Sequence, residues 1–267
     1  MALPIVLAGI GIAFGIGSGQ VRTFERLAAD DIHKILQGES RVVSVKSRLN
    51  GVIGGALGDL SRVTIAASHF KTDTLPLYTE PDLSRSGKVR ELRIELKDFV
   101  LAGLRCESLV ASIPDCRFDY GLATRQKKIR LSESGVGTGT VKLLEEDLAA
   151  FILRKFKEIK TVSVQLLPDK AVVKGYGEFL IINTNFHVEA QLGTTDGSDL
   201  ILTNCDIRFD GRQAEANAAR VLLDTLNPVV ELDKDLKLLD AVKVKGVKIR
   251  KGYLEAWGDT KIPIRPR

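Results

Sequence analysis

The chain has 267 residues, 44% hydrophobic and 27% charged, a composition typical of a globular protein and not of a disordered one. Its three cysteines lack C-x-x-C spacing, which excludes a zinc ribbon and a scaffold held by several disulfides. The net charge of +5 is concentrated in residues 234–267, which hold ten basic and four acidic side chains. Such a segment either contacts phosphate, in nucleic acid or anionic lipid headgroups, or is a solvated face.

The first nineteen residues, 1–19, contain no charged side chain. As a helix they would span about 28 Å, close to the thickness of a bilayer's hydrocarbon core. Gly11, Gly15 and Gly19 have the four-residue spacing found where membrane helices pack together. The pattern predicts a membrane anchor or an export signal, with a buried or loosely packed N-terminal arm as the alternative.

The next segment predicts an amphipathic helix at about 21–37 followed by strands. Strands are expected near 43–45, 63–70 and 90–97, and the last of these alternates most regularly between apolar and charged residues. Proline and polar residues predict a loop at 74–86. Short β segments should continue over 99–131, broken at Gly103, Pro114 and Gly121.

A second helix is predicted at about 142–158 from a wide apolar stripe. Its members are Leu144, Leu148, Phe151, Ile152, Phe156 and Ile159. Val162-Ser163-Val164 follows the helix, as Val43-Ser44-Val45 follows the first one, so the two units form a quasi-repeat.

Further elements are predicted toward the C-terminus from apolar alternation and turn residues. Strands are expected near 171–182, 185–192, 199–209, 241–250 and 253–257, and a third helix at 213–226 that ends before Pro228. Asp196-Gly197 signals a hairpin turn, and the change of apolar parity across Gly246 predicts a β-bulge.

Helices that precede runs of alternating strands indicate an α+β fold. We expect a curved antiparallel sheet wrapped on the amphipathic helices, with Phe151 and Phe156 buried. The expected organisation after residues 1–19 is a single domain over 20–267, with quasi-repeated halves at about 20–134 and 135–267.

No pattern in the sequence points to catalysis, a metal or a cofactor. His33, His69 and His187 fall in separate elements, and neither a nucleophile elbow nor a P-loop occurs. The sequence therefore predicts that the protein is not an enzyme and needs no cofactor. Cys106 and Cys116 are expected to be buried free thiols, or a disulfide if their two segments pair.

Three short stretches form a pattern: Gly139-Thr140-Val141 leading into Glu145-Glu146-Asp147-Leu148, then Asn227-Pro228, and Gly252-x-Leu254-x-Ala256-x-Gly258. This pattern resembles the LmeA family of phospholipid-binding proteins from bacterial envelopes, which is similar in shape to the tubular lipid-binding superfamily. The resemblance covers about 24–258. It implies a tubular lipid-binding-like fold and non-enzymatic binding or transfer of phospholipid at a bacterial membrane or envelope.

A lipid site needs a long apolar interior, and affinity grows by about 0.8 kcal/mol per buried CH₂. The apolar residues expected to line it are Leu148, Phe151, Ile152, Phe156, Phe186 and Val188. The same residues describe an ordinary core, so a structural envelope protein with a filled core and no ligand is the alternative. A basic nucleic-acid-binding module is a third reading, and no nucleic-acid partner is expected.

Cations are expected to alternate with valines and isoleucine along the strand at 241–250. They are Lys243, Lys245, Lys248, Arg250 and Lys251, and we expect the Gly246 bulge to divide them between the two faces of the strand. They would contact anionic headgroups or, alternatively, protect a strand edge. The expected partner is phospholipid or a membrane surface. We expect the protein to be associated with a membrane, in the cell envelope or on its periplasmic face, with the cytoplasmic face as the alternative.

Overall fold

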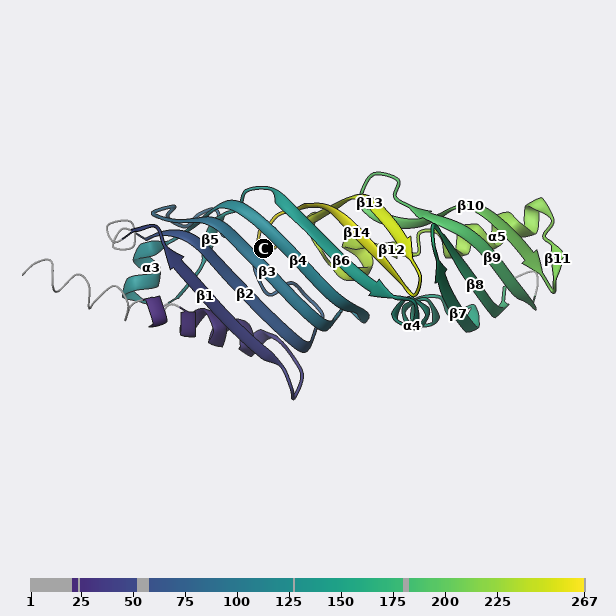
Figure 1. The fold of residues 1–267 in the computed structure, drawn as a ribbon, viewed down its shortest axis with the longest axis horizontal. Helices are drawn as coiled ribbons and strands as arrows, with labels where there is room; N and C mark the ends of the chain where they lie inside the picture. Colours follow the sequence, from purple (N-terminus) through teal and green to yellow (C-terminus); the bar gives the residue numbers. More distant parts are fainter. Residues whose placement is uncertain (1–20, 24, 52–57, 127, 180–182, 267) are drawn as a thin grey trace, which may run out of the picture.

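The computed structural model describes residues 21–23, 25–51, 58–126, 128–179 and 183–266. The predicted anchor at 1–19 and most of the glycine-rich stretch at 50–58 lie outside these residues. No helix in the described ranges is long and apolar enough to cross a membrane. Two curved sheets lie end to end in an elongated molecule (Figure 1).

The described part of the chain begins with helical residues at 21–23 and 25–35, where a helix was predicted. The later elements are β1 (Val42–Leu49), β2 (Asp59–Thr72), β3 (Gly87–Leu101), β4 (Leu104–Phe118), α3 (Tyr120–Arg125), β5 (Leu131–Glu133), β6 (Gly137–Leu144), α4 (Glu145–Lys155), β7 (Ile159–Leu167), β8 (Lys170–Glu178), β9 (Asn183–Gly193), β10 (Asp199–Phe209), β11 (Arg212–Gln213), α5 (Ala216–Leu226), β12 (Val230–Glu231), α6 (Leu232–Leu236), β13 (Val242–Arg250) and β14 (Tyr253–Thr260).

The first sheet has the order β1-β2-β3-β4-β6-β14-β13, with β5 paired to β4, and it curls like half a barrel (Figure 1). The second sheet has the order β11-β10-β9-β8-β7, with β12 paired to β10. With its few helices, this arrangement agrees with the predicted α+β class. Strands β6, β13 and β14 follow residue 134 in sequence but pair within the first sheet.

One strand pair departs from the expected antiparallel sheet, because β2 and β3 are parallel. The chain between Thr72 and Gly87 returns along the sheet before β3 begins. A parallel pair needs a crossover of a dozen or more residues, and the loop predicted at 74–86 supplies it. Alternation of apolar residues shows which face of a strand is buried but not the direction of its neighbour, so the antiparallel prediction was wrong for this pair.

The predicted break at Pro114 is also wrong, because β4 runs through it as one long strand. Pro114 lies opposite Glu91 of β3, and Asp115 next to it has a positive φ of 51°. Proline lacks an amide donor and is tolerated in sheets where the ladder is irregular. The irregular backbone at Asp115 therefore accommodates a residue that usually ends a strand.

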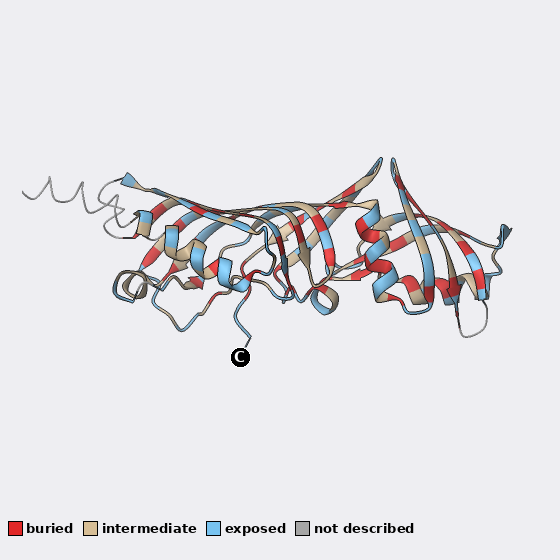
Figure 2. Cartoon of the chain, turned by 90° about the horizontal axis from the view of Figure 1, so that it is seen from below, coloured by how far each residue is buried: buried red, intermediate tan, exposed pale blue. Residues whose placement is uncertain are grey.

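The curvature of the first sheet is linked to a kink shared by neighbouring strands. In β3 the residues that face the cavity are spaced by two up to Leu96, and the next one, Phe99, follows after three positions. Asp98, which lies between them, has a positive φ of 44°. In β2 the same step occurs at His69, which also has a positive φ. Because both strands kink at paired positions, their apolar residues stay on one face while the sheet bends. Figure 2 shows this alternation of buried and exposed residues along the strands.

Helix α4 packs against the second sheet, and Phe151 and Phe156 are buried, as predicted. The hairpin turn at Asp196-Gly197 joins the antiparallel pair β9 and β10. The bulge at Gly246 is confirmed by a register shift between Val244 and Gly246 opposite β14. At the junction of the sheets, the Val244 amide donates to the Gly197 carbonyl at 2.8 Å.

Candidate lipid-binding cavity

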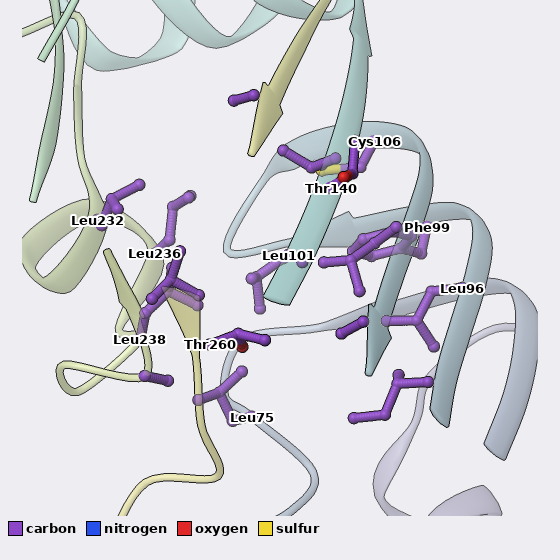
Figure 3. Close-up of a pocket in the computed structure, with 18 of the residues that line it drawn as sticks. Leu75, Leu96, Phe99, Leu101, Cys106, Thr140, Leu232, Leu236, Leu238 and Thr260 are labelled. Carbon is purple, nitrogen blue, oxygen red and sulfur yellow. The ribbon is translucent and has the colours of Figure 1, made fainter. Parts of the chain in front are cut away.

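An apolar cavity of about 230 Å³ lies on the concave face of the first sheet. Its floor is formed by β2, β3, β4, β6, β13 and β14, and Figure 3 shows side chains that point into it from several of these strands. A cavity of about 150 Å³ lined by leucine, isoleucine and phenylalanine is large enough to admit benzene. The space in this sheet therefore has room for part of a hydrocarbon chain.

Two sets of apolar side chains wall the cavity on opposite sides. Ile32 and Leu36 come from the first helix and the residue after it, and both are almost fully buried. Leu232, Leu236 and Leu238 come from α6 and the turn that follows (Figure 3). The curl of the sheet brings these two walls, from opposite ends of the sequence, around one space.

A strap formed by the C-terminal segment and the β2–β3 crossover bounds the cavity. The Thr79 amide donates to the Pro263 carbonyl at 2.8 Å, and the Arg265 amide donates to the Thr79 carbonyl at 3.0 Å. Leu75 and Ile262 beside this pairing line the cavity. The strap therefore fixes two apolar segments that would otherwise be loose loops.

Most of the side chains that line the cavity are apolar. The Cys106 thiol lines the cavity, and burial raises its pKa to about 12, so it stays neutral. The Thr72 hydroxyl is satisfied by donating to the Thr74 carbonyl at 2.6 Å. Three charged residues belong to the lining. Asp259 and Lys261 form ion pairs with Lys245 and Asp240, and the Asp199 carboxylate accepts hydrogen bonds from the Thr195 amide at 2.7 Å and the Thr194 hydroxyl at 3.1 Å. Each charged side chain of the described lining is therefore held by an ion pair or by hydrogen bonds within the protein, and the rest of the lining suits an uncharged chain.

The residues predicted to line a lipid site lie outside this cavity. Leu148, Ile152 and Phe156 line a separate space of about 20 Å³ between α4, α5 and the second sheet, which has room for about one water molecule. Phe151, Phe186 and Val188 are buried in the same hydrophobic core. The α4 stripe is covered by the second sheet, and these six side chains belong to the buried core beside the cavity.

The cavity residues were not identified from the sequence, although part of their signal was visible. The alternation of Leu92, Ile94 and Leu96 predicted a buried strand face, and Ile94 and Leu96 line the cavity. The same pattern describes a filled core. Whether an apolar face meets other side chains or leaves a space depends on the curl of the sheet and on α6.

The cations of β13 all lie on its outward face, so the expected division between two faces was wrong. Val244 and Val247 both pack inward, because the extra residue at Gly246 restores the alternation after the bulge. Lys243, Lys245, Lys248 and Arg250 are exposed, and Lys251 lies in the turn to β14. Lys245 pairs with Asp259 at 2.6 Å, while the other four form no ion pair with another described residue.

The remaining reactive side chains are dispersed. His33 lies on the first helix, His69 on β2 and His187 on β9. Cys106 and Cys116 are free thiols on the same strand, about 33 Å apart at the usual rise per residue, so they cannot form a bridge. Within the described ranges, no cluster of histidine, cysteine and carboxylate side chains could hold a metal ion.

Comparison with known proteins points to the same class of ligand as the cavity. A family model described as LmeA-like phospholipid-binding matches residues 83–256, which is more than half of the chain. The matched segment runs from the residues before β3 into β14 and includes most of the cavity floor. Neither a curated protein nor a solved structure shows a significant match. The chain belongs to the LmeA-like phospholipid-binding family.

Proposed function

We propose that the protein binds a phospholipid by enclosing an acyl chain in the cavity of the first sheet, and that it does so without a chemical step. The observation that carries this proposal is an apolar space of about 230 Å³ in a member of a phospholipid-binding family. Each CH₂ buried there contributes about 0.8 kcal/mol. The headgroup phosphate stays outside, because the one cation of the described lining, Lys261, is already paired with Asp240.

Binding of this kind allows the protein to shield and transfer lipid at a membrane of the cell envelope. The two sheets and their helices act as one tube-like domain in this proposal, with the two halves as a quasi-repeat. The exposed cations of β13 dock the domain on anionic headgroups. A cation close to such a surface is attracted by about 1 kcal/mol, within a Debye length.

Two neighbouring alanines of β2 provide the test. Ala67 lines the cavity, whereas Ala66 points to the opposite face of the same strand and is half-exposed. Ala67→Phe places a benzyl group in the cavity and should abolish the phospholipid that co-purifies with the protein. Ala66→Phe adds the same group outside and should leave bound lipid unchanged. Solvent extraction and mass spectrometry of the purified proteins give the amounts.

Thermal unfolding of both variants controls for loss of structure. A folded Ala67→Phe protein that retains as much phospholipid as the wild type would show that the cavity is not the site. A wild-type protein that carries no phospholipid and takes none up from vesicles would favour the structural protein without a ligand.

A further inference from the structure

The cavity ends at one side chain of the second sheet. Leu200, the second residue of β10, lines the cavity of the first sheet and also the small space under α4. Of the described residues that line these two spaces, it is the one that they share. The two spaces therefore follow one another, with Leu200 as the partition.

The partition is held in place by backbone pairing on its strand. The Val229 amide donates to the Leu200 carbonyl at 2.8 Å, and Leu200 pairs with Val230 of β12. Two residues further, the Asn227 side chain accepts from the Leu202 amide at 2.8 Å and donates to the Leu202 carbonyl at 3.0 Å. Leu200 is itself only 7% exposed. These contacts hold the backbone of the strand at Leu200, so the side chain is not carried away from the partition by a shift of the strand.

The space beyond the partition is apolar and already contains a small void. It is lined by aliphatic and aromatic side chains, among them Leu148, Ile152 and Leu226, and its volume is about 20 Å³. A hydrocarbon chain that passed Leu200 would meet no polar group of this lining. The isobutyl group of Leu200 lies between the two spaces.

We infer that Leu200 sets the length of acyl chain that the cavity accepts, by closing its inner end. This inference rests on the proposed binding of an acyl chain. Each methylene that enters the cavity should raise affinity about fourfold. The gain should stop at the chain length that reaches Leu200, because further carbons remain in water or force the chain to bend.

The experiment uses the full-length protein and saturated lysophosphatidylglycerols of increasing chain length, in competition with a fluorescent lysophospholipid. Wild-type affinity should rise about fourfold per methylene and then level off. Leu200→Ala joins the two spaces and should move the levelling point to longer chains. Leu202→Ala is the matched control, since Leu202 lies on the same strand, is equally buried and lines only the small space.

Leu200→Val removes less volume and keeps the inference testable if the alanine variant does not fold; it should shift the levelling point in the same direction by a smaller amount. An unchanged levelling point in a folded Leu200 variant that still binds lipid would overturn the role of Leu200 alone. A shift of equal size in Leu202→Ala would overturn it too. A wild-type protein that binds none of the series would overturn the proposed function and this inference together.

Discussion

Two buried cysteines of β4 should make the stability of the protein depend on pH in the alkaline range. Cys106 and Cys116 are buried, and loss of hydration raises the pKa of their thiols to about 12 and about 11, from an ordinary value of 9.0. Both thiols remain neutral in the folded protein at any pH where the unfolded chain begins to ionise. The folded state therefore holds protons that the unfolded state releases.

We predict that the free energy of unfolding decreases as the pH rises above 9. A group whose pKa is raised on folding contributes stability that is complete below its unfolded pKa and is lost as the pH climbs toward the folded value. Each thiol should remove about 1.4 kcal/mol per pH unit in this window. Urea unfolding between pH 8 and pH 10.5 measures the slope. Cys106→Ala should be less steep, and equal slopes would contradict the assignment.

At the scale of elements, α4 is fixed to the rest of the molecule through its last residue. The Lys155 ammonium donates to the Pro228 carbonyl at 2.9 Å and pairs with Asp235 of α6 at 2.6 Å, in a contact where both side chains are mostly buried. This contact links the helix that covers the second sheet to the helix that walls the cavity.

Replacing this lysine should destabilise the protein strongly. Lys155→Met removes the charge but keeps the length of the side chain, and it leaves Asp235 with a buried, unpaired carboxylate. We expect a loss of about 3 kcal/mol from the free energy of unfolding, measured in urea. Lys157→Met, two residues away and exposed, should change stability by less than about 0.5 kcal/mol. Similar losses in both variants would show that the Lys155 contact contributes little.

The sequence predicted elements better than their contacts. Periodicity located α4 and the long strands because each buries one face, and the parity change at Gly246 identified the bulge, where a Cβ would overlap the ring of Trp257. The parallel pairing of β2 with β3 and the strap at Thr79 were not predicted, because they join segments with no local signal. The cavity depends on those contacts, so its lining could not be derived from any single stretch.

At the scale of the whole molecule, the outward cations of β13 should control attachment to membranes. Replacing Lys243, Lys245 and Lys248 with Gln should weaken binding to phosphatidylglycerol vesicles by about 2 kcal/mol, roughly thirtyfold, because Lys245 already pairs with Asp259. Liposome flotation at several salt concentrations measures the effect, and the dependence on salt should flatten.

A second triple variant has the same change in net charge elsewhere. Lys157, Lys160 and Lys174 are exposed in and near the second sheet, and their replacement by Gln should leave vesicle binding close to that of the wild type. Equal weakening by both triple variants would indicate a general effect of net charge. Unchanged binding in the β13 variant would leave edge protection as the role of those cations.

The strap between Thr79 and Pro263 has a consequence for folding of the chain during its synthesis on the ribosome. Synthesis proceeds from the N-terminus at about 5–20 residues per second, so β2, β3 and β4 emerge well before β14 and the C-terminal segment. Until Pro263 has left the exit tunnel, the apolar inner face of these strands lacks the cover that the C-terminal segment supplies. Completion of the first sheet is therefore a late event in synthesis, and we expect part of its apolar face to be exposed to solvent until then.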